Sequence, residues 1–460
     1  MKTIRRMISS IIITVMLLST FACSGGEAEV FDYSLDYGDD SSELDFGGQS
    51  MLILTGWDEE WKPESGFTAM GDHLIARYKE IETKYHCYID IFEGNTGFET
   101  FILTNVAAST DRIPDMVDCH ASEIYGIYKM NMLTPYDDVR TIDINDEKWG
   151  NKNFIRYGNF NGLQYGAFPY DWEFIPAILG VCMFDSTVLR EAGINKTPHE
   201  MLEDGTWTWI NFEPLLESAT YTEGDFKVTG LGYEDATRLS QTALFSNGCQ
   251  IVEKQGEKNR FALTNNKAYE TFDWLKGLKD KGLIYQTGYG DFNQHKMLFF
   301  VGESFNFTHM TQFHIDTDTP VYKHDGYGFA PFPCGPNGEY GVGGSYITQG
   351  RRLNWLLKAG QMEKDDLGRL MNILFEPLEG TNRKAWIDFL EKSVFYYRED
   401  DRNAFLNMVE NVKYDWSSPL ESAYSSLTGA FGKILNGSES AASALGAVEE
   451  KINNQLDKQG

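Results

Sequence analysis

Residues Gly162 to Phe212 read GLQYGAFPYDWEFIPAILGVCMFDSTVLREAGINKTPHEMLEDGTWTWINF. This stretch decides the fold, because a polar and aromatic group, Tyr170 to Glu173, is followed closely by an apolar run from Ile178 to Phe184. The apolar run has the length of a buried strand. A polar and aromatic patch that leads into a buried strand is typical of a cleft wall, so we predict that the chain crosses here between two lobes.

Length and charge narrow the class of protein. The chain has 460 residues, more than one hydrophobic core usually supports, so two or more lobes are expected. Its 68 acidic residues outnumber the 40 basic ones and give a formal net charge of -28. Such a field repels phosphate backbones and anionic lipid, which argues against nucleic-acid partners and charge-driven membrane binding. It suits an extracellular protein with a neutral or cationic ligand.

The first residues have the pattern of a targeting segment. Lys2, Arg5 and Arg6 precede an apolar run, Met7 to Leu18, that is too short to span a bilayer comfortably. We therefore predict a lipoprotein signal peptide over residues 1–22. It would place the protein on the extracellular face of the cell membrane.

Cys23 follows the small residue Ala22, as in a bacterial lipobox, in which the cysteine is acylated with palmitate or a similar lipid and becomes the mature N-terminus. Thr20 departs from this motif, which usually has leucine there, so an ordinary signal peptide with an incidental cysteine is the alternative. Residues 23–49 are acidic and contain no Lys or Arg. We expect them to form a flexible tether rather than a specific docking peptide.

The five other cysteines are odd in number and have no short repeated spacing, which does not support a disulfide framework or a CxxC metal site. We expect buried free thiols. These cysteines are Cys87, Cys119, Cys182, Cys249 and Cys334.

Short apolar strands alternate with helical patterns after the tether. Strands are predicted over residues 51–55, 88–92 and 114–117, and helices over 71–85, 96–108 and 124–133. This alternation predicts an α/β fold with a largely parallel sheet. Because ligands gather at the carboxyl ends of such strands, the strand ends at Trp57, Asp58 and His120 are candidate contacts.

The later part of the chain continues this pattern and then becomes helical. Helices are predicted over 212–219, 238–247 and 266–282, strands over 297–301 and 340–348, a short strand that runs into Pro/Gly turns over 326–338, and only helices after residue 349. Asn265 is expected to cap the third of these helices, and Gly282 to end it.

Several motifs occur in a fixed order along the chain. They are IPDM at 113–116, LTPYDD at 133–138, EDGTWTW at 203–209 and GYGFAPFPCGPNG at 326–338. With the lipobox and the acidic tether, this order resembles the family 1 extracellular solute-binding proteins, the maltose-binding type of substrate-binding lipoproteins of ABC importers in Gram-positive bacteria. The resemblance covers roughly Met51 to Lys458.

The resemblance implies a two-lobed fold of the periplasmic-binding-protein type (type II), with a mostly parallel sheet flanked by helices in each lobe and a ligand cleft between the lobes. The N-terminal lobe would combine residues 50–175 with 349–405. The C-terminal lobe would combine 176–348 with 406–458. The chain would cross near Pro176 to Val181, near Gly341 to Thr348 and near Phe405 to Lys413.

The resemblance also implies a function. A monomeric receptor would capture a carbohydrate, such as an oligosaccharide, and deliver it to the permease subunits of an ABC importer. The lipid on Cys23 would hold it at the membrane. A non-transport sugar sensor or a polysaccharide-active enzyme is the alternative.

Sugar binding needs flat apolar rings for the C–H faces of pyranoses, and carboxylates or amides for the hydroxyl groups. The candidate ligand contacts are therefore Trp57, Asp58, His120, Tyr170, Asp171, Trp172, Glu173, His309, Tyr346 and Tyr424.

Each candidate has a structural alternative. Trp57 and Trp172 could equally pack in a core, and His120 could be a hydrogen-bonded structural histidine. Tyr424 lies on an apolar helical stripe, and only the resemblance gives it a role with sugar. Trp207 and Trp209 are assigned to packing, because the resemblance puts their segment behind the cleft.

No motif for catalysis is present. The sequence contains no GxSxG, HExxH, Walker A or GxGxxG pattern. A chain this acidic offers many carboxylate pairs, and none is singled out as that of a glycosidase. We therefore predict a binding protein rather than an enzyme, with no cofactor and no metal site.

Overall fold

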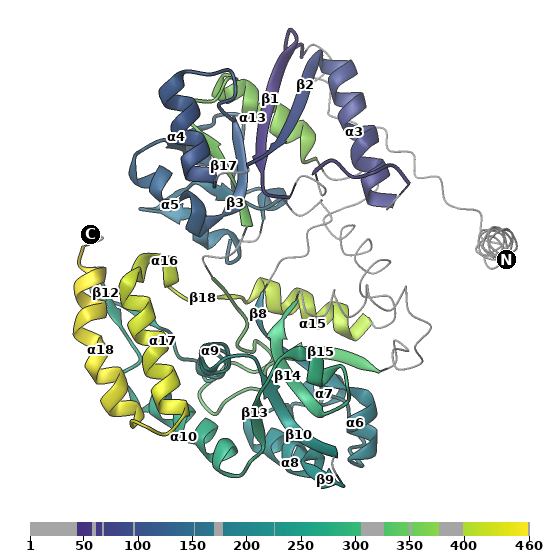
Figure 1. Cartoon of the computed structure of the whole chain (residues 1–460), viewed down its shortest axis with the longest axis vertical. Coiled ribbons are helices and arrows are strands. Elements are labelled where there is room, and N and C mark those ends of the chain that lie inside the picture. The colour runs from purple at the N-terminus through teal and green to yellow at the C-terminus, as the bar shows by residue number, and fades with distance from the viewer. Residues whose placement is uncertain are drawn as a thin grey trace, which may run out of the picture.

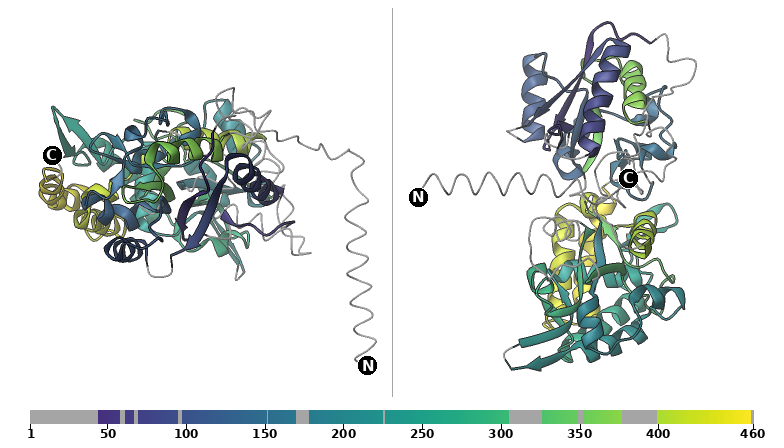
Figure 2. Two further views of the ribbon diagram at one scale, coloured as in Figure 1. Left: turned by 90° about the horizontal axis from the view of Figure 1, so that it is seen from above. Right: turned by 90° about the vertical axis from the view of Figure 1, so that its right-hand side faces the viewer.

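The computed structural model describes residues 44–57, 61–66, 69–94, 97–150, 152–169, 178–224, 226–304, 326–348, 352–376 and 399–458. In these ranges the chain forms two lobes, each with a β-sheet and surrounding helices. Figure 1 and the right-hand view of Figure 2 show the two lobes one above the other. This architecture confirms the predicted two-lobed α/β fold.

The first lobe, at the top of Figure 1, has the strand order β2-β1-β3-β17-β4, with β7 beside β17. Its strands are β1 (Gln49–Thr55), β2 (Cys87–Glu93), β3 (Met116–His120), β4 (Leu133–Thr134), β7 (Gly166–Ala167) and β17 (Arg352–Leu357). β1 is parallel to β2 and to β3, as predicted, whereas β17 runs antiparallel to β3.

Helices cover both faces of this sheet. They are α3 (Ala69–Tyr85), α4 (Phe98–Ala108), α5 (Ala121–Lys129) and α13 (Lys364–Leu374). Successive residues of β1 point to opposite faces. Leu54 packs in one core with Phe98 of α4, and Ile53 packs in the other with Ile81 of α3. A strand buried on both faces reads as a continuous apolar run, which is why β1 was predictable.

The second lobe has the strand order β13-β10-β14-β8-β16-β18, with β15 beside β8 and β9 beside β10. Its strands are β8 (Leu179–Asp185), β9 (Tyr221–Glu223), β10 (Phe226–Tyr233), β13 (Ile284–Gln286), β14 (Met297–Glu303), β15 (Tyr327–Pro331), β16 (Tyr346–Ile347) and β18 (Lys413–Tyr414). Its helices are α6 (Ser186–Glu191), α7 (Pro198–Glu203), α8 (Trp209–Ala219), α9 (Ala236–Ser246), α10 (Asn266–Asp280), α15 (Glu399–Glu410), α16 (Ser417–Leu420), α17 (Ser422–Leu435) and α18 (Ala441–Leu456).

Short elements complete the chain. They are η2 (Tyr136–Asp138), η3 (Glu147–Trp149), η4 (Ile155–Gly158), the strand pair β5 (Asn159–Phe160) and β6 (Leu163–Gln164), the hairpin of β11 (Val252–Gln255) and β12 (Lys258–Phe261), and α11 (Tyr289–Phe292).

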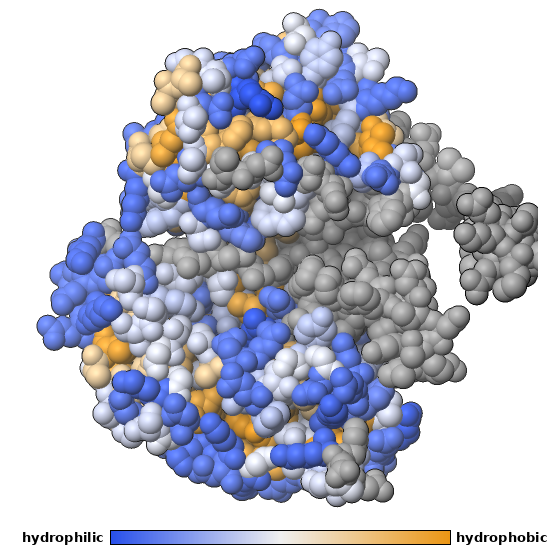
Figure 3. Space-filling view, in the orientation of Figure 1, coloured by the Kyte–Doolittle hydropathy of each residue, from blue (hydrophilic) through white to orange (hydrophobic). Residues whose placement is uncertain are grey.

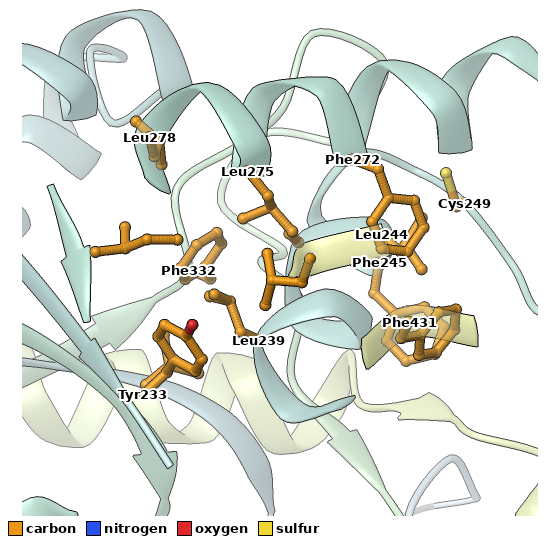
Figure 4. Packing of buried hydrophobic residues seen from close by; sticks show 14 of the residues in the cluster. Tyr233, Leu239, Leu244, Phe245, Cys249, Phe272, Leu275, Leu278, Phe332 and Phe431 are labelled. Atoms are coloured by element: carbon orange, nitrogen blue, oxygen red, sulfur yellow. The ribbon is translucent and has the colours of Figure 1, made fainter. Parts of the chain in front are cut away.

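The core of the second lobe follows from helix periodicity. The Asn265 side chain accepts a hydrogen bond from the backbone N–H of Ala268 at 3.0 Å, so α10 has the predicted cap. Figure 4 shows Phe272 and Leu275 of α10 pointing into the cluster that contains Leu244 of α9. Trp207 and Trp209 belong to the same core, which confirms that they pack rather than face ligand.

Most strands of each sheet run in one direction, as predicted, but one long strand in each sheet runs against its neighbours, and the lobe crossings explain why. β8 is antiparallel to β14, and β17 is antiparallel to β3. Each of these two strands is the first long strand after the chain changes lobe. It therefore enters its sheet at the edge where the neighbouring parallel strands end. The prediction of helices only after residue 349 was wrong for β17, because a short apolar run fits a strand as well as a helix.

The chain reaches the second lobe earlier than expected at the third crossing. Residues 399–405 were expected in the first lobe, but the carboxylate of Asp401 accepts a hydrogen bond from the backbone N–H of Phe329 in β15 at 2.9 Å. The same carboxylate lies 3.2 Å from His199 Nε2. The start of α15 therefore packs on the second lobe, whereas Asn153 of the first lobe donates a hydrogen bond to the Glu410 carbonyl at the end of this helix. The change from one sheet to the other falls between α13 and α15.

All five cysteines in the described ranges are buried and free, as predicted, and burial raises the pKa of the Cys87 thiol to about 11. Figure 3 shows hydrophilic residues on both lobes, together with a band of hydrophobic residues across the first lobe. Among the helices described, none is long and apolar enough to cross a membrane.

Candidate ligand site between the lobes

One edge of the first-lobe sheet faces the second lobe. Arg352 opens β17 and pairs with His120 at the end of β3, and β1 ends beside them at Thr55. From Ile347, the last residue of β16 in the second lobe, the chain needs only five residues to reach Arg352, at most about 18 Å. The carboxyl ends of β1 and β3 therefore lie next to the crossing.

A buried carboxylate gathers the side chains at this edge. Asp118 in β3 is 1% exposed. It accepts hydrogen bonds from Thr55 Oγ1 at 2.9 Å, from Trp61 Nε1 at 2.6 Å and from Arg352 Nε at 2.6 Å. Arg352 Nη2 donates a second bond to it, so the pair is bidentate. This pairing satisfies a charge that would be costly to bury alone.

Trp57 stands over this pair with its ring partly exposed. The guanidinium carbon of Arg352 lies 4.4 Å from the centroid of the Trp57 ring, which is a cation–π contact. The His120 ring meets Trp57 edge to face, with centroids 5.0 Å apart. A flat ring held by its neighbours at a sheet edge can stack on an apolar ligand face.

The lobes touch directly beside the crossing, at the segment from β18 to α17. Tyr157 of η4 and Ser417 of α16 share a hydrogen bond of 2.8 Å. Lys129 of α5 forms an ion pair of 2.7 Å with Glu421. First-lobe groups thus hold this second-lobe segment from two elements.

The same junction carries a second set of partly exposed rings. The guanidinium carbon of Arg156 lies 5.1 Å from the Tyr414 ring and 5.8 Å from the Trp416 ring. Trp416 has φ of 60°, which a bulky residue rarely adopts. Asp415 closes a turn around Trp416 by accepting the backbone N–H of Ser417 at 2.9 Å, and this turn holds the unusual conformation.

Asp415 is also the centre of a buried hydrogen-bond chain. Its carboxylate accepts bonds from Ser417 Oγ at 2.7 Å and from the Tyr424 hydroxyl at 2.8 Å. The Tyr424 oxygen accepts from Gln241 Nε2 at 2.9 Å. Ser417 also shares a hydrogen bond with Tyr157 of the first lobe. This series of hydrogen bonds therefore links α9 and α17 of the second lobe to the first lobe.

No cation forms an ion pair with Asp415 among the residues described, in contrast to Asp118. Burial raises the pKa of Asp415 to about 7, although the hydrogen bonds from Ser417 and Tyr424 act in the opposite direction. The carboxyl group therefore changes charge near neutral pH.

The sequence comparisons found nothing: no protein-family model and no curated protein matches the chain. Solved structures do match. The cyclic alpha-maltosyl-1,6-maltose binding protein of Arthrobacter globiformis has a TM-score of 0.64 at 15% identity, covering 90% of this chain and 100% of its own. The sugar-binding protein MalE of Xanthomonas citri has a TM-score of 0.62 at 14% identity, covering 89% and 98%.

The chain has the two-lobed fold of the maltose-binding type of solute-binding proteins. A third match shows that this fold is not confined to proteins solved with sugars. UgpB of Mycobacterium tuberculosis, in complex with glycerophosphocholine, has a TM-score of 0.59 at 13% identity, covering 90% of this chain and 100% of its own.

The predicted contacts fall in two groups within this solute-binding fold. Trp57 and His120 lie together at the first-lobe edge. Tyr346 and Tyr424 lie close enough in the second lobe to interact electrostatically. Tyr346 is 2% exposed and packs on Phe245, so it forms part of the core beneath the edge. Asp58, Tyr170, Asp171, Trp172, Glu173, His309 and the lipidation residue Cys23 lie outside the described ranges.

Sequence reasoning missed the residues that organise both edges. Asp118 is an acidic residue within the otherwise apolar strand β3, and this exception in the pattern could have indicated a functional role. Trp416 and Asp415 follow β18 in a segment that was expected to be helical or a crossing. Within the described chain, no group of three or more His, Cys, Asp or Glu side chains is arranged to hold a metal ion.

The charge change at Asp415 predicts a pH-dependent stability. Its folded pKa of about 7 lies above the ordinary value of 3.8, so the folded protein binds the proton more tightly. The stabilisation is complete below pH 3.8 and is lost as pH rises through 7. Between pH 5 and 8 this residue alone should lower the free energy of unfolding by about 2–3 kcal/mol.

Denaturant unfolding of wild type and Asp415→Asn at pH 5 and 8 measures this effect. The variant should lose this part of the pH dependence, while His199 and His295 titrate alike in both proteins. The exposed Asp143→Asn variant should keep the wild-type dependence. Equal pH dependence in Asp415→Asn and wild type would show that Asp415 does not titrate in this range.

Proposed function

We propose that the protein is a cell-surface lipoprotein that captures a carbohydrate, specifically an oligosaccharide, between its two lobes and delivers it to an ABC importer. The observation that carries this proposal is the partly exposed Trp57 ring at the carboxyl edge of the first-lobe sheet, next to the lobe crossing. Trp416 offers a second partly exposed ring at the junction.

The chemistry of these edges suits a sugar. Indole rings match the C–H faces of pyranoses, and polar groups beside them can pair with hydroxyl groups that lose water on binding. His120 contacts Trp57 at one edge, and Arg156 lies over Trp416 at the other. A ligand that touches both edges binds the closed arrangement of the lobes better than an open one, and this difference in affinity is what drives closure.

The names of the structural neighbours support the sugar class. Besides the two described above, a cyclo/maltodextrin-binding protein in complex with maltotetraose and an ABC substrate-binding protein of Listeria monocytogenes in complex with cycloalternan share the fold. Delivery to permease subunits, action as a monomer and anchoring through Cys23 complete the proposal. They rest on the sequence resemblance and on the lipobox pattern.

Calorimetry tests the ligand class. Titration with maltose, maltotetraose, cyclodextrin, cello- and xylo-oligosaccharides and glycerophosphocholine should show binding of at least one oligosaccharide. Trp57→Ala should weaken that binding about 10–100-fold, because a buried aromatic face contributes roughly 1.5–3 kcal/mol. Trp172→Ala should weaken it to a similar extent, as the sequence predicts.

Tyr88→Ala is the matched control, because Tyr88 is an exposed aromatic residue near the opposite end of a first-lobe strand. It should bind like wild type. Binding of glycerophosphocholine without any sugar would refute the carbohydrate class. Unchanged sugar affinity in both tryptophan variants would refute the proposed contacts.

Lipid anchoring is tested separately in cells. Wild type should incorporate labelled palmitate and sediment with the membrane fraction, whereas Cys23→Ala should stay unlabelled, because the acylated thiol is missing. Cys87→Ala is the control, since this thiol is buried in the first lobe and should not affect labelling. An unlabelled wild-type protein would contradict the anchor.

A further inference from the structure

We propose that Asp118 is a positioning residue, which through Arg352 holds the Trp57 ring in the orientation that meets ligand. This inference rests on the proposed function, because it assigns Trp57 to the ligand. Asp118 itself is buried beneath the edge, so its effect on the ring would pass through its neighbours.

Three separate segments of the chain donate hydrogen bonds to the carboxylate of Asp118. Thr55 comes from the end of β1, Trp61 from the segment after it, and Arg352 from the start of β17. The Thr55 hydroxyl oxygen also accepts the backbone N–H of Trp57 at 3.0 Å. Asp118 is therefore connected to Trp57 by two routes, one through the backbone and one through the guanidinium.

The guanidinium of Arg352 is held by two hydrogen bonds to Asp118. Arg352 donates from Nε and from Nη2 to the two oxygens of Asp118, and two parallel bonds fix the plane of a rigid fork. The central carbon of this guanidinium lies 4.4 Å from the centroid of the Trp57 ring. Because the fork cannot turn while both bonds persist, the carboxylate sets the surface against which the ring rests.

Replacing Asp118 by asparagine would leave the Arg352 guanidinium charged but without its buried ionic partner, and an uncompensated buried charge is costly. The side chain would lower this cost by moving toward water. Arg352 is also the first residue of β17, directly after the lobe crossing. A movement of its side chain would therefore change the orientation of the Trp57 ring and the backbone at the start of β17. A purely structural ion pair would lower stability without any specific effect on Trp57.

Fluorine NMR distinguishes these two roles without a ligand. The full chain is labelled with 5-fluorotryptophan, and the Trp57 signal is identified by its absence from Trp57→Phe. Asp118→Asn and Arg352→Lys should shift or broaden that signal. Asp115→Asn is the matched control, because Asp115 is equally buried just before β3 but bonds to the backbone of Leu52 and Met362. It should leave the Trp57 signal in place.

A double-mutant cycle then connects the ring to binding. With maltotetraose, or the tightest sugar of the panel, Asp118→Asn should weaken binding about 3–30-fold in the wild-type background and less than about twofold in Trp57→Ala, because coupled residues are not additive. Additive effects, or an unchanged Trp57 signal in Asp118→Asn, would overturn the positioning role. Absence of binding by every sugar would refute the proposed function and the ligand role of Trp57, even where the NMR result holds.

Discussion

The rest of the structure depends on one constraint: the chain changes lobe at the same edge of each sheet. Strands that end at this edge, such as β1 and β3, deliver their carboxyl ends to the crossing. A strand that starts there, such as β17 or β8, must run the other way. The mixed sheets, the facing edges and the location of the candidate site all follow from this arrangement.

Two buried carboxylates stabilise the two sides of the crossing in different ways. Asp118 has a cationic partner in Arg352, and the guanidinium of Arg352 in turn lies against the Trp57 ring. In the described part of the chain, the hydrogen-bond donors to Asp415 are neutral, and burial raises its pKa to about 7. The first-lobe edge is thus organised by an ion pair, whereas the junction contains a buried carboxyl group without a cationic partner among the residues described.

Local patterns were sufficient for most elements but not for the connections between them. The strand β1 and the cap of α10 were predictable, because apolar runs and capping residues act over a few positions. β17 was not, since its six residues fit a strand or a helix until the partner strand is known. Trp57 and His120 were found from strand ends. Their support by Asp118 and Arg352, which lie 234 positions apart, exists only in the folded chain.

We propose that ligand binds between the facing edges and contacts both lobes. Hydrogen–deuterium exchange of the full chain, with and without a saturating sugar, tests it most directly. Bound sugar should slow exchange at Thr55–Trp57 and His120–Glu123 in the first lobe, and also at Tyr414–Glu421 in the second. Protection confined to one lobe, or found only on the outer helices α17 and α18 beyond Glu421, would contradict it.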